Sequence, residues 1–354
     1  MKKNAVLDVV RLFANYLIVL VHALAVNQYI ENQTWENALW KVVFHSALLV
    51  TLPALFLISG FLLMKSFSMA TFKDKLIRRV KRLFVPFVIW NVSLVLFYLG
   101  SAHVVPRLAT RVEAFHLDTW AGILDKTISF MQPPLDLPLW YLRALLIYTL
   151  ISPIIWYGLK ICKGIFVYVA LAIWFVVFTY FGWGDHLVHS YPFYSLLCFV
   201  VGAHISLSQK SPFDLLKSKG VRIGAGVVAL IGIVVGCIHF HIWDCFHSNY
   251  RDLAFTLATP CLFIIAFYLW EKVANLRYFQ FLTESSFFLY AGHFLFCSTL
   301  LHAIAPLLNG IEFIGKETLL VLLFVVGGTT LSLTVYAIAK RLLGRFLAPW
   351  DGTL

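Results

Sequence analysis

Charged side chains are scarce in this sequence: Asp, Glu, Lys and Arg make up 13% of its 354 residues. A soluble domain carries roughly 25% charged residues. Apolar runs long enough to cross a bilayer, each about 20 residues, recur along the whole chain. Because these runs are continuous rather than alternating, they argue against an outer-membrane barrel. The predicted fold class is therefore an all-α polytopic membrane protein.

Cysteine is also scarce, and most of the six cysteines lie inside apolar runs, where a thiol behaves as a small hydrophobe. The sequence predicts no disulfide framework, although Cys237 and Cys245 flank one loop and would pair in an oxidising compartment. P-loop, dinucleotide and HExxH motifs are missing. The same loop carries His239, His241, Asp244, Cys245 and His247, whose spacing matches no established metal site. We therefore expect no bound metal.

The basic residues predict how the chain crosses the membrane. The net charge of +11 comes from Lys and Arg gathered in alternate loops, which is a topology signal rather than a nucleic-acid footprint. With the N-terminus in the cytoplasm, 20 of the 28 Lys and Arg fall on inner loops and six on outer ones, leaving Arg11 and Arg143 inside spans. Both termini are therefore predicted to be cytoplasmic, with lipid and not nucleic acid as the surrounding partner.

About ten transmembrane helices satisfy this rule, with eight or twelve as alternatives. They are predicted at 5–26, 44–64, 84–103, 138–158, 164–183, 190–208, 222–240, 252–270, 286–306 and 317–340. Lys2 and Lys3 before an apolar stretch resemble a signal peptide, but His22 interrupts that stretch, so we interpret it as a retained helix. The outer connection 104–137 is predicted to hold a short helix on the membrane surface or over a cavity. We expect a single transmembrane domain over 1–354, with no appended soluble domain.

The first predicted helix carries a line of polar residues. Asp8, Arg11, Asn15 and His22 follow one another at spacings of three, four and seven, which places them on one helical face. Asp8 pairs with Arg11 at one turn's distance. One interpretation is that the charged pair reaches the inner interface and His22 the outer one. The shared face favours a cavity or a substrate path, because ionisable groups inside a membrane usually line one.

A second polar feature is the basic stretch at 73–82, which contains Lys75, Arg78, Arg79 and Arg82. Basic inner loops are common and also hold anionic lipid. The alternative is a phosphate clamp, since Arg79 and Arg82 lie one helical turn apart and arginine binds phosphate in a bidentate manner. The other polar residues inside spans are His45, Trp140, Arg143 and, on one face of a later helix, Ser286, Tyr290 and His293.

Five segments, in this order, resemble the membrane acyltransferase 3 family of bacterial O-acyltransferases. They are Leu7-Asp8-Val9-Val10-Arg11 with His22 after ten intervening residues, Leu57-Ile58-Ser59-Gly60-Phe61, Arg79-Val80-Lys81-Arg82 followed by Pro86, Leu139-Trp140-Tyr141-Leu142, and Ser286-Phe287-Phe288-Leu289-Tyr290-Ala291-Gly292-His293. Each segment alone is weak, and their common order makes the resemblance specific. It covers about residues 5–345.

The resemblance implies an enzyme of the bacterial cytoplasmic (inner) membrane. It would move an acyl group, most commonly acetyl, from cytoplasmic acetyl-CoA or another acyl-CoA to a hydroxyl of a cell-surface or lipid-linked glycan. By motif, His22 would be the general base. Arg11, oriented by Asp8, would stabilise the acyl group or a developing anion.

The remaining motif residues would bind the two substrates. Arg79 and Arg82, with Lys75 and Arg78 beside them, would hold the CoA phosphates, while Ser59 and Gly60 would let the backbone approach the pantetheine arm. Trp140, Tyr290 and His293 would line the acceptor side or brace the first helix. Asn15 and His45 are placed on the acceptor side as well. Arg143 matches no family position and would meet an anionic sugar or a lipid phosphate near the outer end of its span.

Two other functions compete with the enzyme. In a transporter or flippase of a glycan or lipid-linked intermediate, the polar line would be a translocation path, but the sequence has no repeated halves or paired broken helices. A structural subunit would leave the arrangement of Arg11 and His22 unexplained. Labelled acetyl-CoA separates these functions, because only the enzyme deposits acid-releasable label on glycan or lipid.

Overall fold

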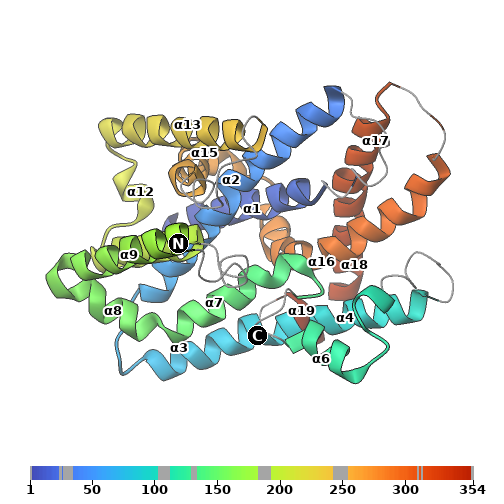
Figure 1. Cartoon of the computed structure of the whole chain (residues 1–354), viewed down its shortest axis with the longest axis horizontal. Coiled ribbons are helices and arrows are strands. Elements are labelled where there is room, and N and C mark those ends of the chain that lie inside the picture. Colours follow the sequence, from blue (N-terminus) through green and yellow to red (C-terminus); the bar gives the residue numbers. More distant parts are fainter. Residues whose placement is uncertain are drawn as a thin grey trace.

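The computed structural model describes residues 2–23, 26, 35–102, 112–128, 134–181, 193–241, 254–308, 311 and 314–351. These residues form helices and turns, and no strand occurs among them (Figure 1). In chain order the main helices are α1 (Lys2–His22), α2 (Trp35–Met64), α3 (Phe72–Arg79), η2 (Val80–Phe84), α4 (Val85–Ser101), α6 (Trp120–Ile128), η3 (Leu137–Leu139), α7 (Trp140–Leu150), α8 (Ser152–Lys160), α9 (Ile165–Phe181), α11 (Phe193–Leu207), α12 (Pro212–Leu215), α13 (Lys219–His241), α15 (Pro260–Ala274), α16 (Phe279–Ile304), α17 (Lys316–Leu322), η6 (Leu323–Gly327), α18 (Gly328–Leu343) and α19 (Ala348–Asp351). The predicted all-α fold is confirmed.

Every predicted span coincides with helical structure, but not every helix is long enough to cross a bilayer. Within the described residues, six stretches are long and apolar enough: Leu39–Met64, Phe72–Ser101, Lys219–Gly236, Ala254–Ala274, Phe279–Leu308 and Lys316–Leu343. The pair α7 and α8 adds a seventh if its two arms, bent by 56°, count as one span. Pro153 at the start of α8 accounts for the bend, because proline has no N–H to continue the helical bonding. Ten spans and cytoplasmic termini stay predictions.

The polar first helix lies inside the assembly rather than at its edge. α1 packs against α2, α15 and α16 (Figure 1). Its apolar positions Val9, Ala14 and Val19 are fully buried. α2 in turn packs against α11, α13 and α15 as well. The polar face of α1 is therefore held in the interior, where its charges need a cavity or partners.

The closest helix crossing lies between α2 and α11. A Cβ on Gly60 would lie 1.9 Å from the carbonyl oxygen of Phe199, and a Cβ on Gly202 would lie 1.9 Å from that of Leu57. No side chain fits at either position, since real Cβ contacts are far longer. The prediction that Gly60 admits the pantetheine arm does not fit this position, because α11 fills the space. Gly60 serves helix packing instead.

The connection 104–137, which is predicted to lie outside, does contain the predicted short helix, α6. Trp120, Leu124 and Ile128 are exposed on one face of α6, at spacings of four residues. Two parts of that connection, 104–111 and 129–133, lie outside the described residues. A position of α6 on the membrane surface stays a prediction.

Candidate active site

A cavity of about 540 Å³ lies between α1, α2, the segment from α3 to η2, α7 and α16. Its cationic lining residues are Arg11, Lys75, Arg78, Arg79 and Arg82. Its acidic lining residues are Asp8 and Glu284. The structure thus brings all four predicted phosphate-binding side chains to the foot of α1. Five cations against two carboxylates favour a ligand with several negative charges.

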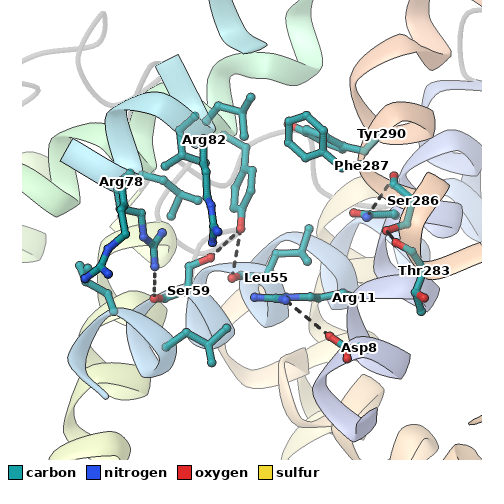
Figure 2. A pocket seen from close by; sticks show the side chains of 18 of the residues that line it. Asp8, Arg11, Leu55, Ser59, Arg78, Arg82, Thr283, Ser286, Phe287 and Tyr290 are labelled. Carbon is teal, nitrogen blue, oxygen red and sulfur yellow. Dashed lines mark hydrogen bonds and ion pairs between the residues drawn. The ribbon is translucent and has the colours of Figure 1, made fainter. Parts of the chain in front are cut away.

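The arginines at 78–82 reach the cavity from an α-helix that continues directly into a π-helical turn. α3 ends at Arg79, and the π-helical turn η2 follows and carries Arg82. Pro86 stands just after this turn and has no N–H to bond the carbonyl of Arg82, so a regular α-helix cannot run through. Short π turns recur at functional sites. Figure 2 shows Arg82 and Arg11 reaching into the cavity from opposite walls.

Two of the cations also hold the end of α2. Lys75 Nζ donates to the carbonyl oxygens of Leu63 at 2.8 Å and Lys65 at 2.6 Å. Arg79 Nη2 donates to the carbonyl oxygen of Ser59 at 3.2 Å. Cations are favourable here because the C-terminal carbonyls of a helix carry partial negative charge. Lys75, predicted to bind the cofactor, therefore caps α2 while adding its charge to the cavity.

Ser59 is fixed by a tyrosine that sequence reasoning missed. The hydroxyl of Tyr141 donates to the carbonyl oxygen of Leu55 at 3.2 Å and lies 2.8 Å from Ser59 Oγ. Because the tyrosine hydrogen is used on Leu55, Ser59 Oγ is the donor in the second bond. Tyr141 lines the cavity, whereas the ring of its neighbour Trp140 packs against that of Phe56, with centroids 5.7 Å apart and planes inclined by 43°. The signal in the sequence is the Trp140-Tyr141 pair, of which the resemblance indicates the tryptophan.

The N-terminal part of the polar line on α1 lies in this cavity. Asp8, Arg11 and Asn15 all line it, as their helical spacing predicts (Figure 2). Arg11 Nη1 lies 3.6 Å from Asp8 Oδ1, and the two side chains are 42% and 41% exposed. Such a half-exposed pair contributes little to stability, so its charges stay available to a ligand. Asn15 Nδ2 donates to the carbonyl oxygen of Ser286 at 3.3 Å and ties α1 to α16.

The C-terminal end of the polar line, His22, packs against a second histidine. His22 ends α1, and its ring lies against that of His293 on α16, with centroids 4.8 Å apart and planes inclined by 58°. His22 Nδ1 lies 2.8 Å from the carbonyl oxygen of Ile18, and His293 Nδ1 lies 2.6 Å from that of Tyr290. His22 is half-buried, and His293 is fully buried. Neither histidine is among the residues that line the cavity.

Tyr290 stands between the cavity and the histidine pair. It lines the cavity, and its ring centroid lies 6.0 Å from that of Tyr141 and 6.4 Å from that of His293. Its hydroxyl donates to the carbonyl oxygen of Pro138 in η3. Just before η3, the backbone N–H of Asp136 donates to Asn91 Oδ1 at 3.0 Å, and burial raises the pKa of Asp136 well above its usual range. Tyr290 is therefore bonded to the segment before α7, which Asn91 of α4 bonds in turn.

The structure separates the other predicted site residues from this arrangement. Arg143 is 1% exposed within α7 and does not line the cavity, so it is not presented to a substrate there. His45 lies on α2, and its side chain falls outside the described residues. The loop residues Asp244, Cys245 and His247, and the side chains of Cys237, His239 and His241, fall outside them as well. In the described part of the chain, no group of three or more His, Cys, Asp or Glu is placed to hold a metal.

Sequence reasoning missed the part of the cavity wall that flanks Ser286 on α16. Thr283, Glu284 and Phe287 line the cavity there. Glu284 accepts a bond from Gln280 Nε2 at 2.8 Å and pairs with Lys340 of α18. A helix period starting from Ser286 would have found Thr283 one turn earlier.

Comparison with known proteins identifies the family of this chain. A model of the acyltransferase 3 family, described as an acyltransferase domain, matches residues 4–337, nearly the whole chain. No curated protein and no solved structure matches. The matched region contains the cavity, the polar line of α1 and the histidine pair. This chain therefore belongs to the acyltransferase 3 family.

Proposed function

We propose that this acyltransferase moves an acetyl group from acetyl-CoA to a hydroxyl of a cell-surface or lipid-linked glycan. The ester C–O bond forms as the thioester C–S bond breaks, and CoA leaves as the thiol. The enzyme would work as a multi-pass protein of the bacterial inner membrane, with the donor taken from the cytoplasm. The observation that carries this proposal is the five-cation cavity at the foot of a helix whose other end holds His22.

The cavity is the proposed site for the CoA phosphates. Arg78, Arg79 and Arg82 lie on consecutive turns that face it, and guanidinium groups bind phosphate oxygens in a bidentate manner. Arg11 lines the same cavity and is roughly 16 Å from His22 along the axis of α1. We therefore assign Arg11, steadied by Asp8, to the phosphate end rather than to the developing anion. This changes the role that the sequence suggested for it.

The pantetheine arm is proposed to run along α1 from the cavity to His22. Asn15 is the cavity residue of α1 nearest to His22, and their separation by seven positions corresponds to roughly 10 Å of helix. Tyr290 borders this path, since it contacts both the cavity wall and His293. The acceptor would approach His22 from the opposite side, so donor and acceptor meet at the end of the polar line.

His22 is the proposed general base. A carbonyl oxygen only accepts hydrogen bonds, so the contact with Ile18 assigns the ring hydrogen to Nδ1. The lone pair is then on Nε2, which takes the proton of the acceptor hydroxyl as its oxygen attacks the thioester carbon. The proton returns to the departing CoA thiolate, and the ring ends the cycle neutral.

A transfer assay tests the proposal. Purified protein in lipid nanodiscs is mixed with acetyl-labelled acetyl-CoA and with membranes from a strain that lacks this protein, and label on glycan and lipid is counted after alkaline release. We expect acetyl transfer by the wild type and by His204→Gln, whose histidine bonds Tyr168 and does not line the cavity. His22→Ala should still bind CoA and should transfer acetyl roughly 10²- to 10⁴-fold more slowly. Transport of glycan without ester formation would support the rival transporter and overturn the enzyme proposal.

A further inference from the structure

The histidine pair has a feature that a single general base does not require. Both rings present the same nitrogen to the protein: His22 Nδ1 to the carbonyl of Ile18 and His293 Nδ1 to the carbonyl of Tyr290. Each Nδ1 therefore carries the hydrogen, and each neutral ring keeps a lone pair on Nε2. Two lone pairs do not bond each other. The pair is incomplete until one proton is added.

The second ring has no other use for its lone pair. His293 is fully buried, and its Nε2 has no hydrogen-bond partner among the described residues. An unsatisfied buried polar atom is costly, and such atoms in native proteins often mark a functional role. The neighbour whose ring lies against it is His22, at 4.8 Å between centroids. The two rings are thus arranged to share an added proton, which the neutral pair lacks.

We propose that His293 is a positioning residue that accepts a hydrogen bond from His22 once His22 has taken the acceptor proton. The inference rests on the proposed function. The acceptor O–H bond breaks, and its proton binds His22 Nε2. His293 Nε2 then accepts a hydrogen bond from the N–H of protonated His22, so the positive charge is spread over two rings. Meanwhile the alkoxide attacks the thioester carbon. When the C–S bond breaks, the thiolate takes the proton from the pair, and both rings return to their neutral state.

Two substitutions separate this role from simple packing. In His293→Asn the amide nitrogen replaces Nδ1 and keeps the bond to the carbonyl of Tyr290, but nothing replaces Nε2. In His293→Gln the longer amide places its oxygen near the former Nε2, where it accepts a bond from protonated His22. We expect Asn to lower kcat roughly 10- to 100-fold with the KM for acetyl-CoA unchanged. Gln should recover a clear part of that loss.

The assay uses purified full-length protein in nanodiscs, labelled acetyl-CoA and membranes as the acceptor source, with CoA binding measured on each sample. His204→Gln is the matched control, because this histidine bonds Tyr168 and does not line the cavity. Equal kcat for wild type, Asn and Gln would overturn the inference, as would a loss of CoA binding and of kcat together in both variants. If Asn does not fold, Gln against wild type and His293→Leu decides in the same way. A wild type without transfer, or a fully active His22→Ala, would instead overturn the proposed function, and the inference with it.

Discussion

The two ends of the polar line on α1 differ in how their side chains are held. At the cavity end, Arg11 and Asp8 are about two-fifths exposed, and Lys75 and Arg79 are tied to backbone carbonyls of α2. At the other end, His293 is fully buried against His22. The first end combines solvent-exposed charged groups with cations held by backbone hydrogen bonds. This combination suits the binding of a polyanion. The second places a half-buried ring against a fully buried one, outside the cavity, so that a proton taken up there meets a second imidazole.

This difference implies that binding and chemistry are separable along one helix. Removing a cation should weaken the donor complex, and removing a ring should slow the reaction within it. Substitutions at the two ends therefore test directly whether binding and chemistry are separate. The expected effects fall from the histidine end to the cavity wall.

The largest effect is expected at His22. His22→Ala removes the proposed base, and general-base catalysis contributes roughly 10²- to 10⁴-fold, so acetyl transfer should fall by that factor. The affinity for CoA, measured by calorimetry on the same sample, should stay within about twofold, since the cavity is untouched. A parallel loss of CoA affinity would show that the two ends are not separable.

The next effect is expected at the arginines. Arg79→Ala combined with Arg82→Ala should weaken CoA binding by roughly 10- to 100-fold, because hydrogen bonds to charged groups contribute about 1.5–3 kcal/mol each. The loss is less than two full arginine contacts, since Arg79 also donates a hydrogen bond to the carbonyl oxygen of Ser59. Transfer at saturating acetyl-CoA should largely recover. Arg277→Ala, outside the cavity, is the matched control. Unchanged CoA affinity in the double variant would remove the phosphate site from this cavity.

A smaller effect is expected where α2 meets α11. Gly60→Ala places a Cβ 1.9 Å from the carbonyl of Phe199, so the helices must separate, at a cost of about 1–3 kcal/mol in stability. Gly100→Ala is the control, because open space surrounds that position and alanine favours the helix. Thermal unfolding in nanodiscs compares the two. A Gly60→Ala melting point equal to that of Gly100→Ala would contradict the tight crossing.

The smallest effect is expected at Tyr141. Tyr141→Phe keeps the ring but removes the bonds to Leu55 and Ser59, which contribute about 0.5–1.5 kcal/mol each. The KM for acetyl-CoA should rise by roughly threefold as the cavity wall loosens. Tyr148→Phe loses a comparable bond to Ser195 outside the cavity and should leave KM unchanged. Equal KM values for both variants would show that Tyr141 does not shape the donor site.

The helix faces were predictable because they follow from local geometry. The spacing of Asp8, Arg11 and Asn15 places them on one side of any regular α-helix, and they do line one cavity. The basic stretch was equally readable as a helix that carries Arg79 and Arg82. Its π turn was not anticipated, although Pro86 was visible as the cause.

Contacts between distant segments could not be predicted in the same way. The role of Gly60 depends on α11, which lies more than a hundred residues later and carries no recognisable motif. The encounter of His22 with His293 joins the first helix to α16, and only the packed structure brings their rings together. Tyr141 was hidden by a neighbouring tryptophan whose side chain points elsewhere. Local pattern thus indicated the residues, and tertiary packing decided their partners.

The most direct test is a cryo-EM map of the full-length protein in nanodiscs with a non-hydrolysable acetyl-CoA analogue in which a methylene follows the sulfur. The account predicts phosphate density among Arg78, Arg79 and Arg82 and the acyl carbonyl next to His22, with the pantetheine arm along α1. Phosphate density away from the cavity, or an acyl group that ends remote from His22, would contradict it.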